Sequence, residues 1–174
     1  MAYTFFVAKG YHVGTSLFEA DKVELAKEMM QKAVDKGVNF LLPIDNVISN
    51  EFAENAEYKT INSDEFPDGW MGMDIGPETA ACFTEAIQGA GTVIWNGPMG
   101  VFEFPAFAAG TNAIAQAMST LENAVTIVGG GDSVSAVEKT GFASKISHIS
   151  TGGGASLEFL EGLELPGIVC LEDR

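Results

Sequence analysis

Three short strand-like segments of the chain each end in a glycine-rich loop and are followed by a helix-like segment. The strand-like segments cover residues 92–95, 124–128 and 147–150, and the last two lead into runs of three consecutive glycines. Strands that alternate with helices are typical of a mainly parallel sheet covered by helices on both faces. The pattern therefore predicts an α/β fold.

The rest of the chain continues the same alternation. Predicted helices cover 2–8, 21–36, 77–88, 107–121, 132–139 and 155–160, and further predicted strands cover 38–42, 58–61 and 168–171. Asp21 is the expected N-cap of the second helix. The first helix has no strand before it, so we expect leading strands of the domain to lie outside this sequence. The expected fold is thus a doubly wound, Rossmann-like α/β fold, truncated at its N-terminal side.

Composition limits the kinds of partner and compartment. The chain has 9 Lys and Arg residues against 24 Asp and Glu residues, a net charge of −15. This balance argues against a nucleic acid or an anionic membrane bound by a broad basic face. No apolar stretch reaches about 18 residues, and the N-terminus lacks the features of a secretory signal. We therefore expect no membrane span and a cytoplasmic location.

The three glycine-rich loops are candidates for binding an anion. In an open parallel sheet, ligands bind beyond the carboxyl ends of the strands, where glycines expose backbone N–H groups and helix N-termini attract negative charge. Neither the P-loop pattern nor the complete G-x-G-x-x-G pattern of dinucleotide-binding domains is present. Both absences argue against those two site types, and tight strand-to-helix turns remain the alternative explanation of the glycines.

Two acidic residues near these loops have two interpretations each. Asp132, with Ser133 beside it, suits either an N-cap or a ligand of Mg²⁺ next to phosphates. Glu103 suits either a solvated surface position or a contact to ribose hydroxyls. His12 and His148 are expected to be structural. Because the loops contain almost no Lys or Arg, a phosphoryl-transfer site here would need Mg²⁺ and cations from outside this chain.

Five segments together resemble the phosphoglycerate kinase family. They are Leu41-Leu42-Pro43-Ile44-Asp45, the segment from Gly69 to Pro77, Trp95 to Glu103, Gly129 to Ser133, and Ser147 to Glu158. The order is that of the family, and the likeness extends over essentially the whole chain. It implies that residues 1–174 are part of the C-terminal, nucleotide-binding domain of a two-domain kinase. The N-terminal domain of the family, which binds 3-phosphoglycerate or 1,3-bisphosphoglycerate, is absent from this sequence.

The resemblance implies a role for each matching position. The adenine pocket would be lined by Phe52, Gly72, Met73 and Val101, and the ribose hydroxyls would bind Glu103. The phosphate chain would be bordered by Asn96 and Pro98, approached by the backbone of Gly130 and Gly131, and contacted by Ser133. Asp132 would coordinate Mg²⁺. The catalytic contacts to the transferring phosphoryl group would come from Gly152, Gly153 and Gly154. At Gly153, the need for a positive φ is the alternative reason for glycine.

The implied reaction is phosphoryl transfer between 1,3-bisphosphoglycerate and ADP in glycolysis, with Mg²⁺, by a monomeric enzyme. The carboxylate leaving group needs no general acid, so catalysis is positioning and charge neutralisation. The isolated chain is expected to be inactive. Two alternatives stay open: a nucleotide-binding module without turnover, and a dehydrogenase-type Rossmann domain, which the missing G-x-G-x-x-G pattern disfavours.

Overall fold

The computed structural model describes residues 1–171 and divides the chain into two compact units. Unit 1 comprises Met1–Ala86 and Met99–Ile114, and unit 2 comprises Ile87–Pro98 and the described residues from Ala115 onward. The chain thus passes from unit 1 to unit 2, back, and again to unit 2. Within the described residues, no helix is both long and apolar enough to span a membrane.

Unit 1 contains a three-stranded antiparallel sheet in the order β2-β1-β3, formed by β1 (Asp45–Ser49), β2 (Tyr58–Asn62) and β3 (Met71–Ile75). Val47 in β1 pairs with Thr60 on one side and with Asp74 on the other. The sequence pattern predicted a mainly parallel arrangement and did not indicate this sheet. The connection from β1 to β2 explains their antiparallel pairing, because a short loop joins antiparallel neighbours, whereas parallel pairing needs a long crossover. The next strand, β3, pairs with the other edge of β1.

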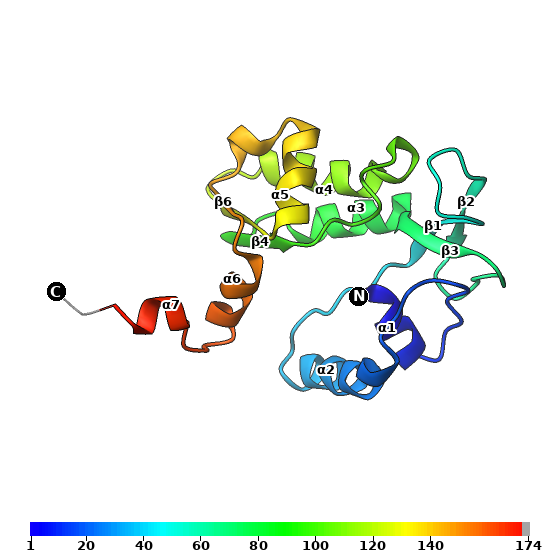
Figure 1. The fold of residues 1–174 in the computed structure, drawn as a ribbon, viewed down its shortest axis with the longest axis horizontal. Helices are drawn as coiled ribbons and strands as arrows, with labels where there is room; N and C mark the ends of the chain where they lie inside the picture. Colours follow the sequence, from blue (N-terminus) through cyan, green and yellow to red (C-terminus); the bar gives the residue numbers. More distant parts are fainter. Residues whose placement is uncertain (172–174) are drawn as a thin grey trace. The chain divides into compact units, whose positions relative to one another are not determined.

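Helices α1 (Ala2–Ala8) and α2 (Val23–Asp35) pack against each other in unit 1 (Figure 1). Phe6 of α1 belongs to a buried cluster with Val13, Ile48 and Phe66, which ties this helix to the sheet. The first helix is therefore confirmed with its predicted bounds. The predicted N-cap of α2 is wrong, because Asp21 lies in a 3₁₀ turn (Ala20–Lys22) and Lys22 precedes the helix without a capping side-chain bond.

The predicted strand over 38–42 is also wrong. These residues form a loop, Val38 is 58% exposed, and the first paired strand begins at Asp45. An apolar run becomes a strand only where a neighbouring strand takes its backbone hydrogen bonds, and β1 pairs with β2 and β3 instead. The run resembles a buried strand in sequence alone because apolar length carries no information about pairing partners.

Helix α3 (Pro77–Ala86) begins at a carboxylate supplied by β1. Asp45, which is buried, accepts hydrogen bonds from the N–H groups of Glu78 (3.0 Å) and Thr79 (2.8 Å) and from the Thr79 hydroxyl (2.6 Å). These N–H groups have no partner inside the helix. A Cβ at Gly76 would overlap the Asp45 carboxylate, so the glycine leaves the space that this cap occupies.

Asp45→Ala is expected to lower the free energy of unfolding by about 2–4 kcal/mol, because it strips a buried helix end of its charged acceptor. Urea unfolding of the chain measures this change. Glu78→Ala, at an exposed position in the first turn of the same helix, is the matched control and should shift stability by less than about 0.5 kcal/mol. Equal effects of the two substitutions would rule out the capping role of Asp45.

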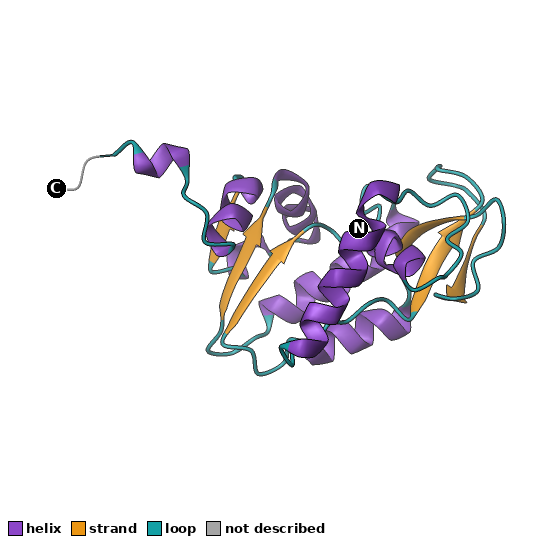
Figure 2. Ribbon diagram, turned by 90° about the horizontal axis from the view of Figure 1, so that it is seen from below, coloured by secondary structure: helices purple, strands orange, loops and turns teal. Residues whose placement is uncertain are grey.

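Unit 2 contains a parallel sheet in the order β4-β5-β6, formed by β4 (Thr92–Asn96), β5 (Val125–Gly129) and β6 (His148–Ser150) (Figure 2). Helix α5 (Gly131–Thr140) follows β5, and α6 (Gly153–Leu160) follows β6. Helix α4 (Ala109–Ser119) begins in unit 1 and ends in unit 2. The predicted α/β fold with a parallel sheet flanked by helices is confirmed.

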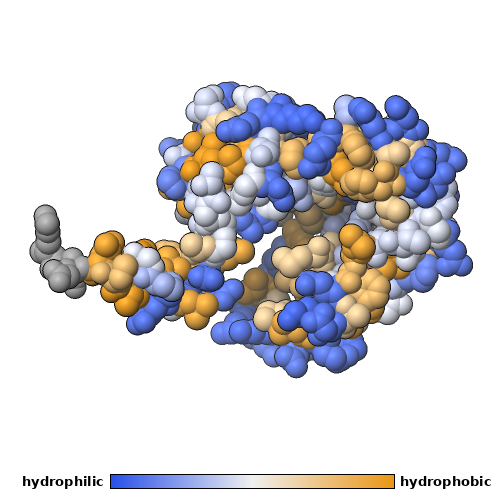
Figure 3. Space-filling view, in the orientation of Figure 1, coloured by the Kyte–Doolittle hydropathy of each residue, from blue (hydrophilic) through white to orange (hydrophobic). Residues whose placement is uncertain are grey.

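The predicted strand over 168–171 is wrong. The chain forms a short helix, α7 (Pro166–Val169), which begins at a proline, a residue whose fixed φ suits the first helical position. Apolar side chains of α6 and α7 lie exposed, among them Phe159, Leu160 and Ile168. Figure 3 shows this apolar surface in orange over the two helices.

Candidate functional site

The carboxyl ends of the three parallel strands lie in register. Asn96 of β4 pairs with Gly129 of β5, and Gly129 pairs with Ser150 of β6. The glycine-rich loops that follow these strands therefore meet at one edge of the sheet. Helices α5 and α6 begin within the second and third loops, so their free N–H groups lie at that edge. This is the position where open parallel sheets bind ligands.

Two of the loops approach each other so closely that only glycine fits. A Cβ at Gly153 would lie 2.5 Å from the Gly130 Cα and 2.8 Å from the Asn96 Oδ1. A Cβ at Gly130 would lie 3.0 Å from the same Asn96 oxygen. Gly130 also has a φ of 91°, whereas Gly153 has no positive φ. The reason for glycine at position 153 is thus the contact between loops, and the alternative of a positive-φ turn is wrong there.

Gly153→Ala is expected to lower the free energy of unfolding by about 1–3 kcal/mol, because the new methyl group meets backbone that cannot rotate away. Gly154→Ala is the matched control, since a Cβ there meets nothing within 4 Å and alanine favours a helix. Thermal unfolding compares the two variants. A melting temperature for Gly153→Ala equal to that of Gly154→Ala would contradict the close approach.

Ser133 connects α5 to the loop after β4. Its hydroxyl accepts a hydrogen bond from the Gly97 N–H at 2.6 Å, and the Trp95 indole N–H donates to the Gly97 carbonyl at 2.6 Å. Ser133 is 1% exposed, so the hydrogen bond between its hydroxyl and the Gly97 N–H is buried. Its place in the structure is to fix the loop that carries the neighbouring Pro98.

Asp132 lies in the first turn of α5 with an exposed side chain. Gly130 is the N-cap residue, and Asp132 is the second residue inside the helix. Of the two interpretations that the sequence left open, the structure therefore excludes the cap. The exposed carboxylate beside free N–H groups leaves Asp132 available to a ligand.

Asp132 suits a magnesium ion that is also bound to the phosphates of a ligand. No group of three or more His, Cys, Asp and Glu side chains that could hold a metal occurs in residues 1–171. Mg²⁺ is commonly held by one or two carboxylates, with phosphate oxygens and water as its remaining ligands. A single exposed carboxylate at a helix N-terminus suits that arrangement.

Unit 1 brings together the other predicted residues. The Val101 N–H donates to the Met73 carbonyl at 2.8 Å, which attaches the segment carrying Val101 and Glu103 to β3. The ring of Phe52 contacts that of Phe104, next to Glu103, with 5.3 Å between centroids. Phe52 is largely exposed and Glu103 is exposed, whereas the Met73 side chain is buried in the core.

Gly72 has a packing reason to be glycine. A Cβ there would overlap the Tyr3 ring of α1, and the Gly72 N–H donates to the Ser16 hydroxyl at 2.9 Å. Burial of Tyr3, together with the nearby Asp74 carboxylate, raises the pKa of the Tyr3 hydroxyl. The neutral Tyr3 ring therefore supports β3 from its inner side at the position of Gly72.

Asp74 is a buried acid whose importance the sequence analysis missed. Its Oδ2 accepts the Gly110 N–H at 2.8 Å, and its Oδ1 accepts the Ile75 N–H at 2.8 Å. Burial raises the pKa of Asp74 to about 6, although the hydrogen bonds from Gly110 and Ile75 oppose the rise. The available signal in the sequence was an acid between the apolar residues Met73 and Ile75, two positions before Gly76.

The raised pKa makes stability depend on pH. The folded state holds the Asp74 proton more tightly than the unfolded chain does. Protonated Asp74 therefore adds to the free energy of unfolding, fully below about pH 4, and this addition is lost as the pH rises through about 6. Asp74→Asn cannot titrate, so its unfolding free energy should rise relative to that of the unmutated chain by about 1–2 kcal/mol between pH 5 and pH 7.5. Urea unfolding at several pH values measures the difference. A constant difference over this range would contradict the raised pKa.

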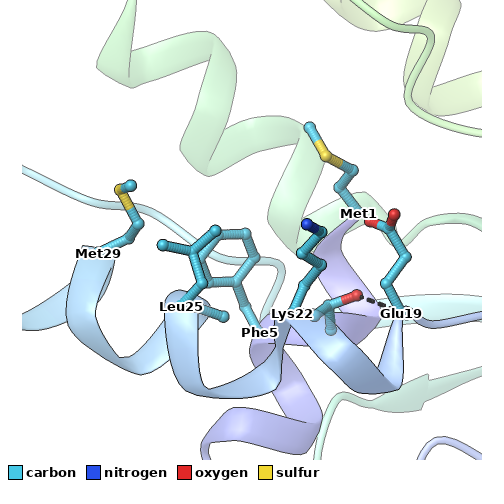
Figure 4. Close-up of a pocket in the computed structure, with 8 residues that line it drawn as sticks. Met1, Phe5, Glu19, Lys22, Leu25 and Met29 are labelled. Carbon is cyan, nitrogen blue, oxygen red and sulfur yellow. Dashed lines mark hydrogen bonds between the residues drawn. The ribbon is translucent and has the colours of Figure 1, made fainter.

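An apolar groove in unit 1 contains none of the predicted site residues. It lies between α1 and α2 and is lined mainly by Phe5, Leu25 and Met29, with Lys22 and Glu19 at one end (Figure 4). Its polar contact is the Glu19 N–H, which donates to the Thr4 hydroxyl at 3.1 Å. With so few polar groups, the groove is not a candidate for binding a phosphorylated ligand.

The geometry is that of an α/β protein in which glycine-rich loops and two helix N-termini lie at the carboxyl ends of parallel strands. A sequence profile described as phosphoglycerate kinase matches residues 1–163, and the chain belongs to the phosphoglycerate kinase family. A phosphoglycerate kinase of Clostridium novyi (strain NT) is 60% identical over all 174 residues, which cover 44% of that protein. The chain thus spans less than half of its relative.

Two solved structures are similar to the chain. Phosphoglycerate kinase from Coxiella burnetii has a TM-score of 0.91 and 42% identity, covering 97% of this chain and 43% of that one. Phosphoglycerate kinase from Pyrococcus horikoshii OT3 has a TM-score of 0.81 and 32% identity, covering 97% and 42%. Both likenesses extend to nearly the whole of this chain and support the same family.

Proposed function

We propose that the chain is the part of a phosphoglycerate kinase that binds Mg-ADP or Mg-ATP, from the C-terminal domain of a two-domain enzyme. The observation that carries the proposal is the convergence of the loops after β4, β5 and β6 around Asn96, with two helix N-termini at the same edge. Backbone N–H groups at such an edge bind phosphate without any lysine or arginine. The family membership supplies the class of ligand.

The proposed roles follow the family resemblance residue by residue. Phe52, Gly72, Met73 and Val101 are proposed to line the adenine site, and Glu103 to bind the ribose hydroxyls. Asn96, Pro98, Gly130 and Gly131 are proposed to border the phosphates, and Gly152, Gly153 and Gly154 to contact the transferring phosphoryl group. Ser133 is also proposed to contact the phosphates, and its buried hydroxyl accepts the Gly97 N–H and so holds the Gly97 loop in place. Gly72 and Met73 contribute backbone or small contact areas, because Tyr3 and the core already occupy their other sides.

Asp132 is the residue proposed to hold Mg²⁺, which would supply positive charge to the nucleotide phosphates. The reaction is proposed to be transfer of a phosphoryl group between 1,3-bisphosphoglycerate and ADP in glycolysis. The chain contributes orientation and N–H donors to the oxygens of the transferred group, and no general acid is required for a carboxylate leaving group. The remaining cations and the phosphoglycerate site are proposed to lie in the N-terminal part of a monomeric, cytoplasmic enzyme.

A calorimetric titration of the chain with Mg-ADP tests the nucleotide-binding proposal. We expect saturable binding of Mg-ADP that weakens when EDTA removes the metal, and no saturable binding of NADH. The NADH arm separates this proposal from a dehydrogenase-type domain, which the chain resembles only in its parallel sheet. Saturable NADH binding without ADP binding would replace the proposed function by the alternative.

A further inference from the structure

The Asp74 carboxylate contacts both ends of the segment from Gly100 to Gly110. At one end, a Cβ on Gly100 would overlap the carboxylate and lie 2.7 Å from the Asp74 Cα. At the other end, the Gly110 N–H donates to Oδ2 at 2.8 Å, and a Cβ on Gly110 would lie 2.5 Å from Oδ1. Only glycines allow the segment to approach the acid so closely from both sides.

Two further hydrogen bonds hold the same segment. The Val101 N–H donates to the carbonyl of Met73, the residue before Asp74, and the Met99 N–H donates to the buried Thr111 hydroxyl at 3.1 Å. Val101 and Glu103, two of the proposed nucleotide contacts, lie inside this closed segment. The position of both relative to β3 therefore depends on Asp74 and its immediate neighbours.

The burial of Asp74 is not explained by an ion pair. It is 2% exposed, and no cationic side chain in the described part of the chain forms an ion pair with it. A buried carboxylate without a cation destabilises the folded state unless backbone N–H groups compensate it. The two N–H bonds offset part of this cost. An apolar residue could not replace the carboxylate, because its two oxygens accept hydrogen bonds from the Ile75 N–H of β3 and from the Gly110 N–H in the first turn of α4.

We propose that Asp74 is a positioning residue for nucleotide binding, which fixes the segment from Gly100 to Gly110 against β3 so that Val101 and Glu103 meet the adenosine group. The inference rests on the proposed function. Asp74 does not touch the nucleotide, and its effect is transmitted through Gly100, Gly110 and the Val101–Met73 hydrogen bond. Its loss should affect binding of the adenosine group and not of the phosphates, because the residues proposed to contact the phosphates are not among those that Asp74 holds.

Asp74→Asn tests this role because the amide has nearly the shape of the carboxylate. Its NH₂ group cannot accept a hydrogen bond, so one of the two N–H donors loses its acceptor. The Kd for Mg-ADP should increase about tenfold or more, while the Kd for Mg-pyrophosphate, which lacks adenosine, should stay the same. Asp45→Asn is the matched control. It changes an equally buried strand carboxylate that accepts two helix N–H groups, but at α3, and should leave both Kd values of the folded chain unchanged.

The outcomes separate the two proposals. If the unmutated chain binds Mg-ADP and Asp74→Asn binds it equally well, the positioning role is wrong and the proposed function stands. If the unmutated chain fails to bind Mg-ADP, the proposed function fails and this inference fails with it. Should Asp74→Asn not fold, hydrogen exchange in the unmutated chain decides the matter. Saturating Mg-ADP should slow exchange of the Val101 and Gly110 amides about tenfold, and unchanged exchange at both would overturn the role.

Discussion

Asp132→Ala should reduce kcat/KM for Mg-ADP by about 100-fold or more in a completed enzyme, meaning this chain joined to the N-terminal part of its 60% identical relative. The substitution removes the one carboxylate at the N-terminus of α5 that is exposed to a ligand. Polyphosphate charge would then lack a protein-bound metal. Stability should change by less than about 0.5 kcal/mol, because Asp132 makes no capping bond.

Steady-state assays over a range of Mg²⁺ concentrations measure this effect. High Mg²⁺ should restore part of the activity of Asp132→Ala, since the lost group is a metal ligand and not part of the fold. Ser135→Ala, at an exposed position on the same helix, is the control and should behave as the unmutated enzyme. Near-normal activity of Asp132→Ala together with a lowered melting temperature would instead restore the capping interpretation.

The parallel half of the fold was predictable from sequence. The apolar residues of β4, β5 and β6, and the glycines and helix starts that follow them, are all local features of the sequence. A strand, a helical crossover and a second parallel strand have one favoured arrangement, the right-handed crossover. The loops of the candidate site were predictable for the same reason, because their position follows from strand order. Strand order places Gly130, Asp132 and Gly153 in these loops, whereas the ligands proposed for them come from the family resemblance.

The antiparallel half depends on pairing that no local pattern encodes. Residues 38–42 are as apolar as many buried strands, yet β1 forms seven residues after Val38, where Asp45 also caps α3. The capping of one element by a side chain from another joins residues more than thirty positions apart. Asp74 and Gly110 were missed for the same reason. Their relation appears only when β3 and the start of α4 lie in contact.

The chain alone should have no measurable kinase activity. Transfer requires two polyanions in line, and the chain carries a net charge of −15 with no Lys or Arg in the three loops of the site. Repulsion between the reacting phosphates would then be opposed only by N–H groups and by a metal at Asp132. We propose that the cations and the phosphoglycerate site lie in the part of the relative that this chain does not span.

Complementation tests this account most directly. The chain is mixed with a separately produced N-terminal part of the 60% identical relative, and ATP formation from ADP and 1,3-bisphosphoglycerate is measured for the mixture and for each part. The account predicts activity in the mixture, none in either part, and a loss of about 100-fold when the chain carries Asp132→Ala. Robust activity of the chain by itself would contradict the account, because the whole catalytic machinery would then lie within these 174 residues.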